Sequence, residues 1–242
     1  MNWQGKRYWL VGASAGLGKA LAQAMAAKGA KLILSARSEE PLQELAQEIG
    51  GAEVVTVDVR DTESVKAAAE AAGEVDGVIF LAGVYWPMAA QDWDAEKVEA
   101  MADIDYTGAI RVLGQVVPQM VARDRGHIVL TGSLSAFRGL PGSIGYSASK
   151  AGVKSLAESM RCDLHKTGVR VQLANPGFIR TRLTDQNDFA MPQIMEPEEA
   201  ADHMMRLMEN ERRFESSFPV PFAWVFRAAQ VFPDWLYFRI FG

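Results

Sequence analysis

The sequence is poor in metal-binding and disulfide-forming side chains. It holds one cysteine and three histidines among 242 residues. The single Cys162 excludes an internal disulfide and a cysteine-based zinc site, and we expect it to be a buried helix residue. His127, His165 and His203 lie far apart and show no metal-ligand spacing. We therefore expect no metal centre, and a structural role for His127.

The chain also lacks an excess of positive charge and a long apolar run. Its formal net charge is −5, from 25 Lys and Arg against 30 Asp and Glu, and it shows no basic stripe. This balance argues against a nucleic-acid partner. The first residues, Met1 to Arg7, are polar, and the first apolar run is too short for a signal peptide. We therefore expect a cytoplasmic protein with no transmembrane segment.

Apolar segments of strand length alternate with segments of helical periodicity over most of the chain. Strands separated by helices of this kind predict one doubly wound parallel sheet with helices on both faces, an α/β fold. We expect about seven strands in the order 3-2-1-4-5-6-7. The expected strands are 6–11, 31–35, 53–57, 75–81, 126–131, 169–174 and 214–218. Among the expected helices, the two longest are 92–121 and 146–166.

A glycine-rich turn follows the first strand directly and leads into an Ala-rich helix. Glycines let the backbone approach a pyrophosphate closely, and a helix N-terminus offers free N–H groups and a positive dipole end. The spacing is G-x-x-x-G-x-G, not the commoner G-x-G-x-x-G. A turn that binds no ligand is the alternative to a dinucleotide site. The candidate cofactor-binding residues are Gly12, Ser14, Gly16, Leu17 and Gly18.

The end of the second strand indicates which dinucleotide is bound. In dinucleotide folds an acidic residue about 20 positions beyond the glycines binds the adenosine ribose hydroxyls. Here Ala36 and Arg37 occupy that place. A guanidinium binds a 2′-phosphate, so Arg37 predicts NADP, with NAD less favoured. Ser14 either adds a hydroxyl to the same phosphate or caps the turn, and a solvated loop charge is the alternative for Arg37.

Cofactors of such folds lie at the C-terminal ends of the strands. Asp58 and Val59 follow the third strand and are expected near the adenine. Ala82 and Gly83 follow the fourth strand and are expected near the central ribose.

Tyr146 and Lys150 place a phenol and an ammonium four residues apart, on one face of an expected helix. A phenol normally titrates near pH ~10, and a neighbouring cation favours the phenolate and lowers that pKa. The pair is therefore a candidate acid/base unit. A surface tyrosine and lysine on any helix is the alternative, because the spacing alone is a weak motif.

Together these motifs resemble the short-chain dehydrogenase/reductase family in its single-domain form. The glycine loop, Ser133 standing 13 residues before Tyr146, the Tyr146/Lys150 pair and Pro176-Gly177 occur in the family's order. The resemblance covers about residues 5–212. It implies hydride transfer between nicotinamide and a carbonyl or alcohol, by a homodimer or homotetramer joined through the helices near 92–121 and 147–166.

The resemblance also implies a role for each site residue. Tyr146 would donate or accept the proton, and Ser133 would bind the substrate oxygen and stabilise its developing negative charge. Lys150 would lower the Tyr146 pKa and hold the nicotinamide ribose. The positions matching those that bind the carboxamide end of the cofactor are Pro176, Gly177, Ile179 and Thr181.

The chain departs from the family pattern at two places. Phe80-Leu81-Ala82-Gly83 replaces the usual Asn-Asn-Ala-Gly, and Asp105 replaces an asparagine that helps hold a proton-relaying water. Three alternatives are open for Asp105. It pairs with Lys150 through water and partly cancels the effect of Lys150 on the pKa of Tyr146, it is protonated, or it serves the proton relay as well as the asparagine does. These departures motivate an alternative function, an NADP(H)-binding sensor or scaffold without oxidoreductase turnover.

Apolar side chains are expected around the substrate, with no clear clamp for a carboxylate or phosphate. They predict a small, hydrophobic carbonyl or alcohol substrate. The segment 183–195 is expected to close over bound cofactor. The expected lining residues are Tyr85, Trp86, Pro87, Met88, Leu134, Phe137, Leu140, Phe189, Met191 and Met195.

The last residues leave the family pattern, so we divide the chain into a domain at 1–218 and an aromatic-rich, helical extension at 219–242. Prolines and charges interrupt the extension too often for a bilayer-spanning helix. Phe222, Val225, Phe226 and Ala229 share one helical face. The extension packs on the domain or a sister subunit, contacts a membrane peripherally, or covers a lipid-like substrate.

Overall fold

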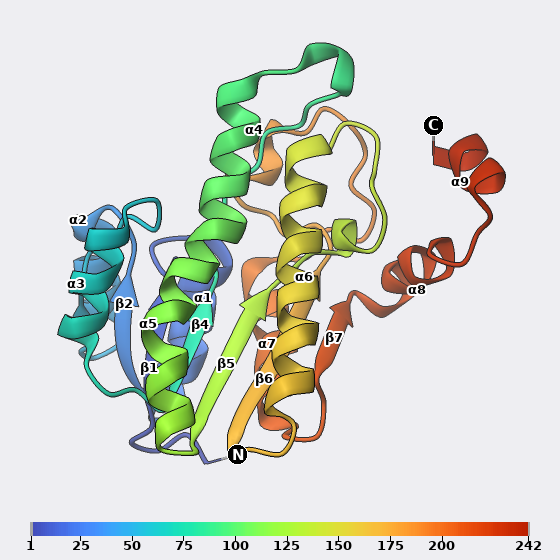
Figure 1. Cartoon of the computed structure of the whole chain (residues 1–242). Coiled ribbons are helices and arrows are strands. Elements are labelled where there is room, and N and C mark those ends of the chain that lie inside the picture. The colour runs from blue at the N-terminus through green and yellow to red at the C-terminus, as the bar shows by residue number, and fades with distance from the viewer. Residues whose placement is uncertain (1, 242) are drawn as a thin grey trace.

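The structure is a computed structural model that describes residues 2–241. It contains a seven-stranded sheet in which all neighbouring strands are parallel (Figure 1). The order β3-β2-β1-β4-β5-β6-β7 confirms the predicted topology. The strands are β1 (Arg7–Val11), β2 (Lys31–Ser35), β3 (Glu53–Val54), β4 (Gly77–Phe80), β5 (Gly126–Thr131), β6 (Val169–Pro176) and β7 (Glu215–Phe218).

Helices cover both faces of the sheet. Alternate residues of β1 enter two separate cores, with Tyr8 and Leu10 in one and Trp9 and Val11 in the other. One core is closed by α1 (Gly16–Ala27), α2 (Glu39–Glu48) and α7 (Pro197–Glu209). The other is closed by α3 (Thr62–Ala72), α5 (Gly108–Ala122) and α6 (Ile144–Leu164). The doubly wound arrangement therefore follows from strands that are apolar on both faces.

The long helix predicted from about Asp92 starts later and is not regular. The carboxylate of Asp94 accepts the N–H of Lys97 at 3.2 Å and caps α4 (Ala95–Met101). A π-helical segment, Ala102–Thr107, then joins α4 to α5. Such segments are uncommon and occur often at functional sites, and this one carries Asp105.

Two smaller expectations also need correction. The strand expected at 53–57 is short and ends at Val54. Beyond it, two single hydrogen bonds continue the pairing with β2 and the residue after it, from Val55 N–H to the Leu34 carbonyl and from Val57 N–H to the Ala36 carbonyl. Cys162 is exposed rather than buried. It lies five residues beyond the buried Ala157, so it points away from the face of α6 that packs on the sheet.

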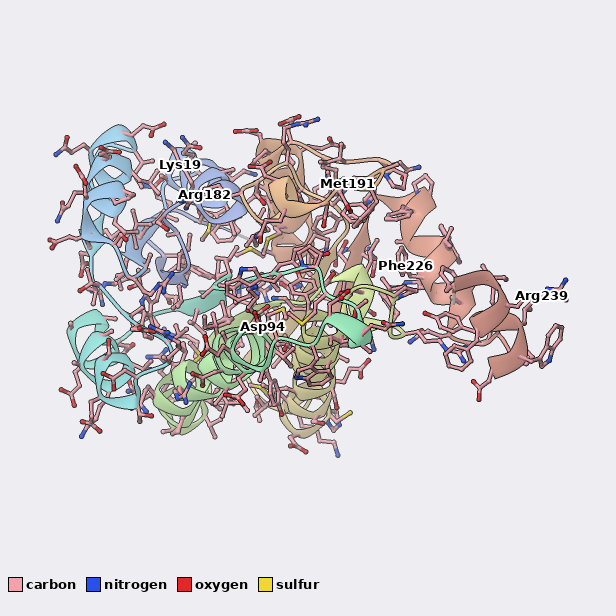
Figure 2. The ribbon with its side chains drawn as sticks, turned by 90° about the horizontal axis from the view of Figure 1, so that it is seen from above. Lys19, Asp94, Arg182, Met191, Phe226 and Arg239 are labelled. Carbon is pink, nitrogen blue, oxygen red and sulfur yellow. The ribbon has the colours of Figure 1, made fainter. Side chains whose placement is uncertain are left out.

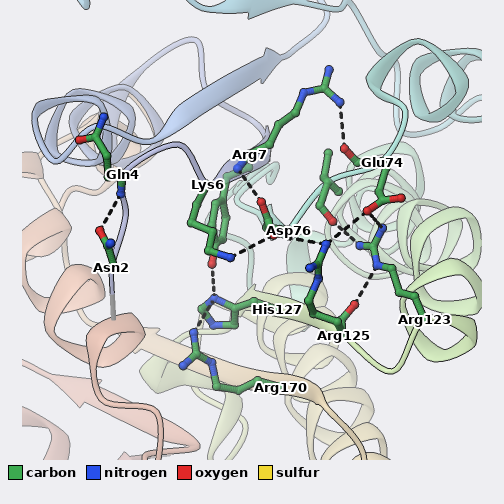
Figure 3. Close-up of polar contacts among 12 residues, drawn as sticks. Asn2, Gln4, Lys6, Arg7, Glu74, Asp76, Arg123, Arg125, His127 and Arg170 are labelled. Carbon is green, nitrogen blue, oxygen red and sulfur yellow. Dashed lines mark hydrogen bonds and ion pairs between the residues drawn. The ribbon is translucent and has the colours of Figure 1, made fainter.

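Polar side chains close the amino ends of the strands (Figure 3). Asp76 accepts the backbone N–H of Arg7 at 2.9 Å and lies 3.3 Å from the ammonium of Lys6. Buried His127 donates from Nε2 to the side-chain oxygen of Gln172 at 2.8 Å. Burial lowers the pKa of His127 to about 3, so the ring stays neutral. His127 therefore has a structural place, as its sequence position indicates.

After β7 the chain forms α8 (Val220–Ala229) and α9 (Asp234–Phe241), which we call the arm. The arm extends away from the sheet to the C-terminus (Figure 1). Within residues 2–241, no helix combines the length and the apolar character needed to span a bilayer.

Candidate active site

A cavity of about 1830 Å³ opens at the carboxyl ends of the strands. Figure 2 looks down on this end of the molecule. Phe226 lies on the part of the arm nearest the rest of the molecule, and Arg239 lies at the far end of the arm. Every residue predicted to bind cofactor or to act in catalysis lines this one cavity. They are Gly12, Ser14, Gly16, Leu17, Gly18, Arg37, Asp58, Val59, Ala82, Gly83, Ser133, Tyr146, Lys150, Pro176, Gly177, Ile179 and Thr181.

The glycine turn packs too closely on its neighbours for any side chain. A Cβ on Gly12 would lie 2.4 Å from the Ala82 nitrogen, and one on Gly18 would lie 2.0 Å from the Gly12 carbonyl oxygen. The turn therefore lies directly against the segment after β4. Among residues 2–241 no side chain caps α1 at Ala15, so the N–H groups of its first turn are free to face an anion. This cradle fits the pyrophosphate of a dinucleotide.

Arg37 lies exposed at the rim of the cavity, directly after β2. The nearby carboxylate of Asp58 pairs with Arg60, whose guanidinium nitrogen lies 2.8 Å away. The bond from Arg60 holds the pKa of Asp58 below its usual value. Because the Asp58 carboxylate forms its ion pair with Arg60, the Arg37 guanidinium is available for an anionic ligand.

Tyr146 and Lys150 leave the first turns of α6 on one face, as their spacing predicts. The Lys150 ammonium lies 5.5 Å from the Tyr146 ring centroid and donates to the Thr131 carbonyl at 3.2 Å. Ser133 follows β5, and its hydroxyl lies close enough to the Tyr146 phenol to lower the pKa of that phenol. A phenol, an ammonium and a hydroxyl therefore meet in one corner of the cavity.

Asp105 reaches this corner from the π-helical segment and is completely buried. One carboxylate oxygen accepts the Val84 N–H at 2.7 Å, and the other lies 3.7 Å from the Lys150 ammonium. That second oxygen has no hydrogen-bond partner within residues 2–241. Burial raises the pKa of Asp105 to about 6, and the charge of Lys150 opposes this rise. Asp105 thus forms an ion pair with Lys150.

This surrounding opposes the expected activation of Tyr146. Burial, and after it the charge of Asp105, raises the pKa of Tyr146 above its ordinary value, while the Ser133 hydroxyl lowers it. The ring still borders the open cavity, although it lies deep among protein atoms. The pKa of Tyr146 is therefore raised in this structure, not lowered as the Lys150 spacing predicts.

Replacing Asp105 with asparagine is expected to move the pH dependence of the alcohol oxidation that the family resemblance implies to lower pH. In this direction Tyr146 must lose its proton before it can accept another, and removing the Asp105 charge lowers its pKa. A single charge close to a titrating group inside a protein shifts the pKa of that group by about 1 unit. The rising limb of kcat/KM against pH should move down by that amount.

The matched control is Asp103→Asn in the same π-helical segment. Asp103 pairs with Arg111 at 2.7 Å, outside the cavity lining. Its removal should leave the pH profile in place. A profile of Asp105→Asn that superimposes on the wild type would contradict the assigned influence on Tyr146.

The substrate end of the cavity matches the predicted lining only in part. The predicted residues that line it are Tyr85, Trp86, Pro87, Met88, Leu134, Leu140 and Phe189. Met195 is buried in the core instead, where it pairs with Ile179, and Phe137 packs beneath Lys154 and Arg227. Met191 also lies outside the lining residues.

Three lining aromatics were missed as site residues: Phe178, Phe222 and Phe226. The four-residue spacing of Phe222 and Phe226 indicated one helical face. It did not indicate which surface that face covers.

A dinucleotide-sized cavity with a glycine turn at one end and a tyrosine–lysine pair at the other defines a nicotinamide-dependent oxidoreductase. Comparison with known proteins narrows this class. The family model described as short chain dehydrogenase matches residues 6–191. The chain therefore belongs to the short-chain dehydrogenase/reductase family, and it is an NAD(P)-dependent enzyme.

The relatives agree with this family. An "uncharacterized oxidoreductase" of Myxococcus xanthus is 39% identical over 237 residues, which cover 94% of this chain and 93% of the relative. A solved "short chain dehydrogenase/reductase family protein" is 31% identical with a TM-score of 0.81, covering 86% of this chain and 91% of its own. An actinorhodin polyketide ketoreductase solved with NADPH is 25% identical with a TM-score of 0.79, and the match covers 88% of this chain and 95% of the ketoreductase chain.

Proposed function

We propose that this enzyme is NADP-dependent and transfers a hydride between nicotinamide and a carbonyl or alcohol of a small, hydrophobic substrate. The meeting of Tyr146, Lys150 and Ser133 in one corner of the cavity carries the proposal. Arg37 at the rim, in the place of a ribose-binding carboxylate, supports NADP. The similar polyketide ketoreductase was solved with NADPH.

The bound cofactor supplies or accepts the hydride at the substrate carbon. Ser133 donates a hydrogen bond to the substrate oxygen. Tyr146 gives its proton to that oxygen as negative charge develops, and takes it back in the reverse direction. Lys150 stabilises the resulting phenolate and holds the nicotinamide ribose.

The remaining cavity residues bind the cofactor along its length. The first turn of α1, with Gly12, Gly16, Leu17 and Gly18, holds the pyrophosphate, and Ser14 joins Arg37 at the 2′-phosphate. Asp58 and Val59 border the adenine, and Ala82 and Gly83 border the central ribose. The carboxamide end contacts Pro176, Gly177, Ile179 and Thr181.

NADPH oxidation against a panel of carbonyl compounds tests this function. We expect the absorbance of NADPH to fall with apolar ketones and aldehydes and to change less with 2-oxo acids, because aromatic and aliphatic side chains such as Trp86, Leu134 and Phe222 line the cavity beside Tyr146 and Ser133. Fluorescence titration measures NADPH binding in parallel. Tight binding without turnover on any carbonyl or alcohol would favour a non-catalytic NADP(H) sensor or scaffold.

We further propose a homo-oligomer joined through α5 and α6, as in the family, acting in the cytoplasm. The exposed thiol of Cys162 supports a reducing compartment. Peripheral membrane contact is proposed for the arm, where Trp224 and Trp235 are 67% and 68% exposed. Light scattering measures the mass of the oligomer. Flotation with lipid vesicles, for the protein with and without the arm, measures the membrane contact.

A further inference from the structure

The arm builds one wall of the substrate end of the cavity. The Phe222 ring centroid lies 4.9 Å from that of Phe226 and 5.8 Å from that of Phe178. Phe178 in turn lies 5.9 Å from Phe189. Segments after β6, before α7 and in α8 thus join into one apolar surface. We call these four side chains the aromatic wall, and all four line the cavity.

Polar contacts hold this wall in place relative to the reacting groups. The Arg138 guanidinium donates to the carbonyls of Ala229 and Phe232 at 2.9 and 2.8 Å. Gln230 donates to the Phe137 carbonyl at 3.2 Å. The loop that receives the arm directly follows the short helical turn begun by Ser133. The position of the wall relative to Ser133 is therefore set by the fold.

The inner face of α8 carries no charge toward the cavity. Its lining residues are both phenylalanines, and Arg227 turns away to pair with Glu215 at 3.3 Å. Trp224 stands on the opposite, exposed face. An ionised group placed against this wall would lose its hydration without gaining a partner. The wall suits an alkyl or aryl group.

We propose that the aromatic wall binds the apolar part of the substrate remote from the reacting carbonyl. Phe222 and Phe226 thereby make the enzyme selective for carbonyl compounds that carry a long alkyl or an aryl group. This specificity rests on the oxidoreductase function proposed above.

A series of methyl ketones from 2-butanone to 2-dodecanone measures this specificity. In the wild-type enzyme, kcat/KM should rise by up to about 4-fold for each methylene that reaches the wall. The double variant Phe222→Ala/Phe226→Ala should lose about 10- to 100-fold on 2-dodecanone and stay within about 2-fold on 2-butanone. Trp224→Ala, on the same helix, should keep the wild-type slope.

Binding of 1-octanol to the NADPH-loaded protein, measured by calorimetry, tests the wall without turnover, because an alcohol cannot react with the reduced cofactor. The double variant should bind it about 10-fold more weakly, with NADPH affinity and melting temperature near those of the wild type. Equal slopes and equal octanol affinities in the wild type and the double variant would overturn the proposal. If the wild-type enzyme turned over none of the ketones while its octanol binding still depended on the two phenylalanines, only the oxidoreductase function would be overturned.

Discussion

Replacing Tyr146 with phenylalanine should lower kcat for carbonyl reduction by about 10²- to 10⁴-fold, the usual contribution of a positioned general acid. The substitution removes only the phenolic hydroxyl beside Ser133 and keeps the half-buried ring. NADPH affinity should therefore stay within about 3-fold. The raised pKa of Tyr146 keeps the phenol protonated at neutral pH, which suits the reduction direction.

Tyr85→Phe is the matched control for this prediction. The Tyr85 ring centroid lies 5.0 Å from that of Tyr146, and burial raises the pKa of Tyr85 to about 12. It offers the same chemistry in the same cavity from a different loop. Steady-state kinetics should show that Tyr85→Phe keeps most of the rate. Comparable losses in both variants, or a Tyr146→Phe enzyme with substantial activity, would reject Tyr146 as the proton donor.

Replacing Arg37 with alanine should weaken NADPH binding by about 1.5–3 kcal/mol, or roughly 10- to 150-fold, the range for a hydrogen bond to a charged group. NADH lacks the 2′-phosphate, so its affinity should change by less than about 2-fold. Because Arg37 is exposed, added salt should weaken the NADPH preference of the wild type. Fluorescence titration with both cofactors measures this.

Arg60→Ala controls for general loss of positive charge at the rim. Arg60 is occupied by Asp58 and does not line the cavity, so its removal should reduce the NADPH preference much less than removal of Arg37. Equal losses of NADPH and NADH affinity in Arg37→Ala would rule out a phosphate contact.

Local patterns in the sequence predicted the fold and the meeting of the site residues. Tyr8-Trp9-Leu10-Val11 is apolar on both faces, which only a sheet covered on both sides can bury. In a parallel sheet all strand ends of one kind lie at one edge, so Gly12, Ala82 and Ser133 had to lie near one another.

Features that depend on distant packing were not predictable in this way. The ion pair of Asp105 with Lys150 depends on a π-helical segment, which has no reliable sequence signal. The raised pKa of Tyr146 follows from burial, which a four-residue spacing does not report. The place of Phe222 in the cavity wall depends on where the Arg138 loop receives the arm.

Hydride transfer in this cavity is tested most directly with NADPH that carries two deuterium atoms at the reactive carbon of its nicotinamide ring, so that transfer from either face is detected. The wild-type enzyme should place one deuterium on the carbinol carbon of the alcohol for each NADPH oxidised, as measured by mass spectrometry. Tyr146→Phe should bind the same cofactor and transfer little. NADPH oxidation without deuterium in the alcohol, or transfer undiminished in Tyr146→Phe, would contradict the proposed function.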